Sequence, residues 1–156
     1  MANKFKTVQK SIMTRQDEIE EKFVNYLMKE WKKSVALRIL HKTISEIRNN
    51  WHMNVKIVIR TAIDNASPTI MVKSARVWWS VYQVPVEVKP KKRFYFACNW
   101  ILKAARNKKW SPMYKKLAEE ILAAYSWQWF AVKKREEAQK MAEANKAFAY
   151  MAKYVH

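Results

Sequence analysis

The side chains in this chain that could do chemistry are mainly lysines and arginines, and they gather in short groups. The 156 residues include 31 Lys and Arg but 13 Asp and Glu, which gives a formal net charge of +18. Ten basic residues and no acid lie between Glu87 and Glu119. Charge of one sign on this scale favours a polyanionic partner, because Lys and Arg hold phosphates with salt-sensitive affinity and little sequence readout. The groups are Lys32–Lys33, Lys73 with Arg76, Lys89 to Arg93, Lys108–Lys109, Lys115–Lys116 and Lys133 to Arg135.

Each basic group has a plain alternative, which is a solvated helix face or loop, and for a single group that alternative usually holds. It weakens for the groups taken together, since the acids do not match them in number. A protein of membrane surfaces more often concentrates its cations on one amphipathic helix, whereas these recur across several elements. We therefore predict nucleic acid as the partner, and no membrane partner.

Catalytic and metal chemistry are not indicated. The chain as written has no glycine, so it has no phosphate-cradling loop or dinucleotide fingerprint. The three histidines lack metal-ligand spacing, and the single cysteine, Cys98, cannot form an internal disulfide and is predicted to be buried. The adjacent acids Glu119–Glu120 and Glu136–Glu137 lie at helical spacing from lysines, which predicts surface charge pairs. We expect no enzyme, no cofactor, no metal and no small-molecule substrate.

The elements that must position the basic groups are mostly helices. Half of the residues are hydrophobic, and the length suits one domain with one core. We predict a mainly α fold, a single-domain bundle of about six helices over residues 17–156, with Ser34 and Ser111 as N-caps. Apolar residues at helical spacing predict helices over 17–30, 34–48, 54–65, 91–107, from Pro112 onward, and 131–154.

The periodicity changes to two over residues 70–88, which predicts a β-hairpin between the third and fourth helices. Pro85 cannot donate to a strand ladder, so its strand presents an edge there. Residues 72–93 carry six Lys or Arg and one acid. Because a lone hairpin is marginal in water, we expect this one to pack at its base and project at its tip. Tyr82 could stack on a nucleic-acid base, although a tyrosine on an apolar strand face is more often core.

Seven of the eight tryptophans lie where chain geometry favours glycine. Trp100 is the exception, on an apolar helix face. Two interpretations compete for the seven: exposed rings that stack on RNA bases, or letters that stand for glycine through a reassigned codon, an editing event or a translation error. We favour glycine, because stacking chemistry would not select only such positions. Four follow a predicted helix (Trp31, Trp51, Trp110, Trp127), two lie in the hairpin turn (Trp78, Trp79) and Trp129 lies in the last link.

Residues 1–16 form a separate basic segment that contains Lys4, Lys6, Lys10 and Arg15 and no acid. A short organelle-targeting segment has this composition, and so does an arm that orders on RNA. We expect a basic N-terminal arm. No apolar run in the sequence is long enough to span a bilayer.

Three stretches resemble the bacterial and organellar type of small-subunit ribosomal protein seven. RVWWSVYQVPVEVKPKKR resembles that family's hairpin, which has two glycines in place of Trp78–Trp79. AVKKREEAQKMAEANKAFAY resembles its last helix, and FVNYLMKEWKKSVA its first helix-to-helix link. The likeness runs from about Phe23 to Tyr150. The departures are the seven tryptophans, segment 1–16 and the tail MAKYVH.

The resemblance implies a structural component of the small ribosomal subunit that binds the 3′ major domain of its rRNA and nucleates assembly of the head. It implies a hairpin near exit-site tRNA and mRNA, and contacts with neighbouring head and platform proteins. Carried over by position, the resemblance implies that seven residues contact rRNA: Lys32, Lys33, Arg76, Lys89, Lys91, Lys92 and Arg93. With the other basic groups, the predicted rRNA-binding residues also include Lys4, Lys6, Lys10, Lys73, Lys108, Lys109, Lys115, Lys116, Lys133, Lys134 and Arg135. The predicted tRNA-facing and mRNA-facing residues are Arg76, Val77, Trp78, Trp79, Ser80 and Tyr82.

The alternative from another class is a free-standing, basic helical regulator that binds DNA. Such a regulator should show a recognition helix and dimer symmetry, and the sequence indicates neither clearly. Abundant lysine and the glycine-like tryptophans favour a mitochondrial ribosome, with a plastid or the bacterial cytoplasm as alternatives.

Overall fold

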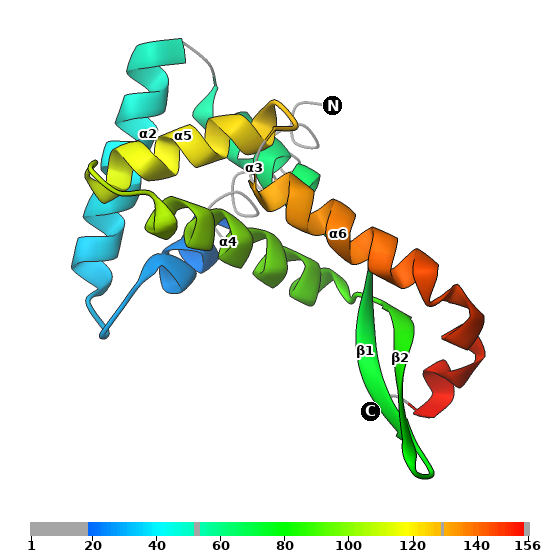
Figure 1. Cartoon of the computed structure of the whole chain (residues 1–156). Helices are drawn as coiled ribbons and strands as arrows, with labels where there is room; N and C mark the ends of the chain where they lie inside the picture. Colours follow the sequence, from blue (N-terminus) through cyan, green and yellow to red (C-terminus); the bar gives the residue numbers. More distant parts are fainter. Residues whose placement is uncertain (1–18, 52–53, 129, 155–156) are drawn as a thin grey trace, which may run out of the picture.

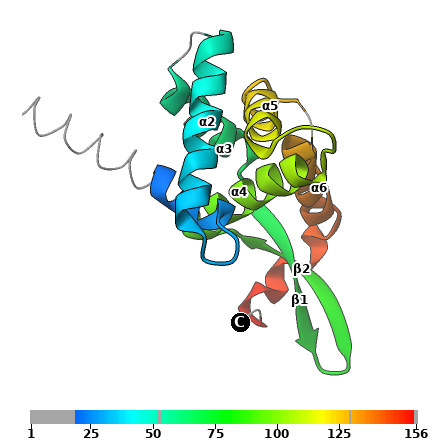
Figure 2. The same ribbon diagram turned by 90° about the vertical axis from the view of Figure 1, so that its left-hand side faces the viewer.

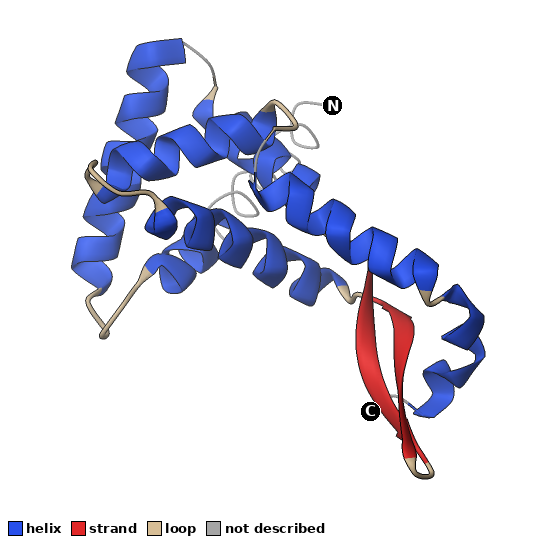
Figure 3. Cartoon of the chain, viewed as in Figure 1, coloured by secondary structure: helices blue, strands red, loops and turns tan. Residues whose placement is uncertain are grey.

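The computed structural model describes residues 19–51, 54–128 and 130–154. A helix over residues 19–27 comes first. It is followed by α2 (Lys33–Trp51), α3 (Val55–Ala66), β1 (Ile70–Val77), β2 (Ser80–Glu87), α4 (Pro90–Asn107), α5 (Met113–Tyr125), α6 (Phe130–Ala144) and the 3₁₀ helix η1 (Lys146–Tyr154). Figures 1 and 3 show a helical bundle from which one hairpin projects. This confirms the predicted mainly α fold with a hairpin between the third and fourth helices.

The main core forms around α5, which packs against α2, α3 and α4. Leu117 and Ile121 of α5 and Ile101 of α4 are among its fully buried side chains, at the helical spacing seen in the sequence. A buried polar side chain forms hydrogen bonds between two helices. The Asn65 amide of α3 donates to the carbonyl oxygens of Ala124 and Tyr125 in α5, both at 3.1 Å. Cys98 is buried as predicted, and burial raises the pKa of its thiol well above the usual range.

The hairpin pairs its strands in antiparallel register from Ile70 opposite Glu87 to Val77 opposite Ser80. A second, smaller apolar cluster lies between the hairpin and η1. It is formed by Ala75, Val84 and Met151, with Val77, Tyr82, Val86 and Phe148 packed against it. The Tyr82 and Phe148 rings lie 5.4 Å apart. Both views show η1 beside the hairpin (Figures 1 and 2). The C-terminal segment thus supports the hairpin over residues 75–77 and 82–86 and leaves the tip uncovered.

The last helix differs from the prediction of one helix over 131–154. It is interrupted at Asn145, whose side-chain amide donates to the Met141 carbonyl oxygen at 2.8 Å. A side chain that binds the carbonyl four residues earlier competes with the helical ladder. The 3₁₀ segment then brings Phe148 and Met151 onto the hairpin. A continued α-helix would place these two side chains elsewhere.

Both predicted N-caps are wrong by one or two positions. Ser34 lies inside α2, which begins at Lys33, and the N-cap of α5 is Pro112 in place of Ser111. The other predicted helix bounds differ from the observed ones by a few residues at their ends, where fraying and capping decide the boundary.

Four of the seven tryptophans at glycine-like positions have a left-handed backbone, the conformation that favours glycine. The φ angles are 60° at Trp31, 58° at Trp78, 71° at Trp110 and 58° at Trp127. A residue with a Cβ atom carries strain in this region that glycine avoids. The prediction of a glycine-like position is wrong for Trp79 and Trp51. The φ angle of Trp79 is not positive, and Trp51 is the last helical residue of α2. Trp129 lies outside the described residues.

None of the helices formed by the described residues has the length and apolar character needed to cross a membrane.

Candidate nucleic-acid interface

The predicted basic residues lie at three places on the fold. Lys32 and Lys33, at the 28–32 turn and the start of α2, Lys108 and Lys109, in the link between α4 and α5, and Lys115 and Lys116, in the first turn of α5, lie at the end of the bundle away from the hairpin. Lys73, Arg76 and the group Lys89 to Arg93 lie on the hairpin and at its base. Lys133, Lys134 and Arg135 lie in the first turns of α6. Lys4, Lys6 and Lys10 are outside the described residues.

At the hairpin base, Arg93 makes structural contacts within the fold. Its Nε donates to the Val88 carbonyl oxygen at 2.7 Å, and its Nη2 pairs with Glu87 at 2.8 Å. Arg93 therefore joins the end of β2 to the start of α4. Lys91 and Lys92 of the same helical turn are exposed, as are Lys89 and, on β1, Arg76. Their ammonium and guanidinium groups are accessible to phosphate.

In α6, two of the three predicted cations contact the protein itself. The Arg135 Nη1 donates to the Asn65 carbonyl oxygen at 2.9 Å, and its guanidinium lies 4.7 Å from the centre of the Trp127 ring. The Lys134 Nζ pairs with Glu137 at 2.6 Å, and this hydrogen bond lowers the pKa of the Glu137 carboxyl. That ion pair confirms the surface pairing predicted for Glu137. Lys133 is exposed.

Lys108 and Lys109 are adjacent in sequence and differ in structure. The Lys108 Nζ lies 2.8 Å from Glu120 and 2.9 Å from Glu119. Burial lowers the pKa of Lys108, but the hydrogen bonds to the two carboxylates outweigh it and the pKa is raised. Glu120 is buried, so its predicted surface position is wrong. Lys109 is exposed.

On α5, the Lys116 Nζ donates to the Lys108 carbonyl oxygen at 2.5 Å, while Lys115 is exposed. Lys116 therefore stabilises the link between α4 and α5, and Lys115 faces solvent. As with Lys108 and Lys109, one of two adjacent lysines contacts the protein and the other is exposed.

The hairpin tip is exposed and partly apolar. Trp78, Trp79 and Val81 are exposed large side chains, and Ser80 is exposed beside them. Tyr82 is half-buried against Phe148, which supports a core role for this ring over base stacking. The accessible surface of the tip is therefore residues 78–81.

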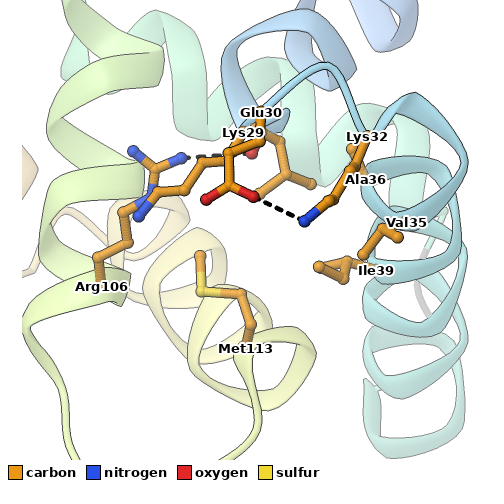
Figure 4. A pocket seen from close by; sticks show the side chains of 9 residues that line it. Lys29, Glu30, Lys32, Val35, Ala36, Ile39, Arg106 and Met113 are labelled. Atoms are coloured by element: carbon orange, nitrogen blue, oxygen red, sulfur yellow. Dashed lines mark hydrogen bonds and ion pairs between the residues drawn. The ribbon is translucent and has the colours of Figure 1, made fainter.

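Sequence reasoning missed Lys29 and Arg106. Neither belongs to a run of basic residues, and they are brought together only by the packing of the 28–32 turn against the end of α4. Figure 4 shows both side chains at one pocket, with the Arg106 Nη2 donating to the Leu27 carbonyl oxygen at 3.3 Å. No group of three or more His, Cys, Asp or Glu side chains among the described residues is placed to hold a metal ion.

Known proteins share most of this sequence. The profile of the family "Ribosomal protein S7p/S5e" matches residues 1–146. A "Small ribosomal subunit protein uS7" from Ruegeria pomeroyi is 44% identical over 134 residues, which is 86% of each chain. Proteins of the same name from Alkalilimnicola ehrlichii and Thermotoga maritima are 44% and 42% identical, over 85% and 86% of each chain.

Proposed function

Because this chain belongs to the ribosomal protein S7p/S5e family, we propose that it binds the 3′ major domain of small-subunit rRNA and nucleates assembly of the subunit head. Proteins of this family are structural, non-enzymatic components of the small ribosomal subunit. The observation that supports the proposal most is the number of basic side chains exposed on the surface of the described residues. Arg76, Lys89, Lys91, Lys92, Lys109, Lys115 and Lys133 are all exposed.

These seven residues come from β1, the start of α4, the link after it, α5 and α6. A folded RNA presents phosphates over a wide surface, so cations spread over several rigid elements suit it better than a single basic helix would. The alternative of a DNA-binding regulator would need one recognition helix and a symmetric dimer. The family assignment and the spread of the cations favour ribosomal RNA.

The predicted division into an arm of residues 1–16 and a domain of 17–156 belongs to the same proposal. The arm would add the contacts of Lys4, Lys6 and Lys10 to rRNA. The domain would supply all the others.

We assign the hairpin to exit-site tRNA and mRNA. Each strand has eight residues, so the hairpin spans about 25 Å at roughly 3.3 Å per residue. The support from η1 holds this length in a fixed direction, and the tip at 78–81 is exposed. The far end of α6 and the tail after it would meet the neighbouring head and platform proteins.

The test is rRNA binding measured as a function of salt. With a fragment of the 3′ major domain, the triple change of Arg76, Lys91 and Lys92 to Ala should weaken binding. It should also flatten the slope of log affinity against log salt by about 0.7–0.9 for each phosphate that is no longer neutralised. Lys103→Ala removes an exposed cation of α4 outside the proposed set and is the matched control. A slope that does not change in the triple variant would refute the role of these residues.

A second measurement separates the hairpin tip from the rRNA surface. Trimming residues 77–81 should leave rRNA affinity largely intact and disturb exit-site tRNA handling. An equal loss of rRNA affinity would contradict a tip that faces tRNA.

For the compartment, the bacterial relatives agree with a ribosome in the bacterial cytoplasm. The mitochondrial ribosome stays a prediction from composition. Identifying the large RNA that co-purifies with the chain, from its sequence, decides between them.

A further inference from the structure

A pocket opens at the end of the bundle away from the hairpin, where the 28–32 turn, the first turns of α2, the end of α4 and the start of α5 meet (Figure 4). Its volume is about 260 Å³. This is close to the lower end of the range of about 300–1,000 Å³ that small-ligand sites occupy. Its lining combines apolar side chains of the bundle with the cations Lys29, Lys32 and Arg106.

The floor and one wall of the pocket are apolar. Leu27 and Ala36 are buried, while Ile39 and Met113 are half-buried and reach the main core from this side. Val35, in the first turn of α2, keeps 44% of its surface exposed. An apolar surface left open among so many cations shelters a flat, uncharged group better than it shelters a phosphate.

The rim of the pocket is cationic. Lys29 and Lys32 come from the turn, and Arg106 comes from the last turn of α4. The bond from Arg106 to the Leu27 carbonyl holds the guanidinium at the edge of the cavity. The one acid in the lining, Glu30, pairs with Lys32 at 2.6 Å, and both side chains of that pair are exposed. An exposed pair of this kind contributes little energy, so Lys32 can exchange Glu30 for a phosphate at small cost.

We propose that this pocket takes one unstacked RNA base, with the phosphates on either side of that nucleotide held by Lys29 and Arg106. The inference deepens the proposed function and rests on it. Sequence-specific RNA recognition commonly splays single bases out of loops and bulges, which makes such a base available to a pocket on the protein. The charge of the rim selects the occupant: two of its three cations have no acid of the lining beside them, which suits a polyanion and opposes a basic ribosomal protein.

Filling the pocket tests the proposal without removing a cation. Val35→Phe places a larger side chain at the mouth. Leu37→Phe is the matched control, since Leu37 is also an exposed residue of α2 and lies outside the lining. For the rRNA fragment, Val35→Phe should weaken binding about tenfold, because the base can no longer bury its apolar faces in the pocket. The salt slope should stay that of the wild type, because every phosphate-binding cation is still present.

Chemical probing of the same complexes gives an independent result. One base of the rRNA should be protected by the wild type and by Leu37→Phe and become reactive with Val35→Phe. Lys29→Ala should lower the salt slope by about 0.7–0.9, the value expected for a single phosphate. If Val35→Phe lowers the melting temperature, Val35→Glu compared with Leu37→Glu replaces it. The glutamate at the pocket should then weaken binding more than its control does.

Equal rRNA affinity for the pocket variants and their controls would overturn the proposal. The proposal would also be overturned if Val35→Phe kept the wild-type rRNA affinity but was incorporated less well into the subunit. That result would assign the pocket to a neighbouring protein. These outcomes differ from failure of the proposed function itself. In that case the wild-type protein would not prefer the rRNA fragment over an unrelated polyanion of the same length.

Discussion

Replacing Lys108 by Met should destabilise the protein far more than replacing its neighbour Lys109. The Lys108 ammonium contacts two carboxylates, at 2.8 and 2.9 Å, and the nearer belongs to Glu120, which is 3% exposed. Without Lys108 that buried charge loses its partner. Breaking a buried pair by removing one member costs about 3–5 kcal/mol. The Lys108 side chain is 28% exposed, so water screens part of the interaction and we expect the lower end, about 3 kcal/mol.

The assay is thermal unfolding followed by circular dichroism. For a chain of this size, 1 kcal/mol shifts the melting temperature by roughly 2–4 °C, so Lys108→Met should melt about 6–12 °C below the wild type. Lys109→Met removes an exposed charge from the adjacent position, and its effect should stay within about 0.5 kcal/mol. The double change of Lys108 and Glu120 to Met should recover much of the stability, since it removes both charges of the pair.

The same interaction predicts a dependence on alkaline pH. The folded-state pKa of Lys108 is raised above its unfolded value, so its contribution is complete below about pH 10.4 and is lost as the pH rises through the folded pKa. The gap between wild type and Lys108→Met should therefore narrow above that pH. The reasoning is refuted if Lys108→Met and Lys109→Met melt together at neutral pH, or if the double variant is no more stable than Lys108→Met.

Two further predictions follow from the hairpin and from the tryptophans. Met151→Ala should destabilise the small cluster with Ala75 and Val84 by about 2 kcal/mol and so speed amide exchange in β2 roughly thirtyfold. Amide exchange in the main core should not change, and the control Tyr150→Ala, at an exposed site, should leave exchange in β2 as in the wild type. An equal increase in exchange across the whole chain would contradict a separate hairpin cluster. Trp110→Gly should raise the free energy of unfolding by about 1 kcal/mol, because Trp110 has φ 71° and is 98% exposed, so strain is relieved while the packing stays the same. The intact mass of the natural protein tests the glycine interpretation directly: a mass that matches the sequence as written rules it out, and a mass lower by seven Trp-to-Gly differences establishes it.

The helices and the hairpin were predictable because each has its own period. In α4 and α5, apolar side chains recur at three and four residues, and in β2 Tyr82, Val84 and Val86 alternate with more exposed residues, so the sequence pattern of these elements shows their buried face. The left-handed backbone at Trp31 and Trp110 was predictable for a related reason, since each lies in a short link where the chain reverses between two helices.

The parts that sequence reasoning missed depend on contacts between distant residues. Nothing beside Asn145 in the sequence shows that the last helix must stop there so that Met151 reaches β1 and β2. Lys108 and Lys109 are the same residue type in the same link, and only the position of α5 separates a buried pair from an exposed charge. Arg106 looks like one more helical cation until the 28–32 turn is placed against it. Charge runs indicate how much positive charge the surface carries, but not which cations the fold itself uses.

That division among the cations explains how so basic a chain can fold and still leave cations exposed for the polyanion that we propose as its partner. Arg93 joins the hairpin to α4, Lys108 joins the α4–α5 link to α5, and Arg135 joins α6 to the end of α3, each through a carbonyl or a carboxylate. Carboxylates neutralise Arg93 and Lys108 locally, while Arg135 is held by the Asn65 carbonyl and the Trp127 ring, so all three stabilise the fold. The exposed ones repel each other across a net charge of +18, which opposes compactness. Under the proposed function, RNA phosphates would remove that repulsion and bind the folded arrangement of the cations more tightly than the unfolded chain, so RNA binding would stabilise the fold.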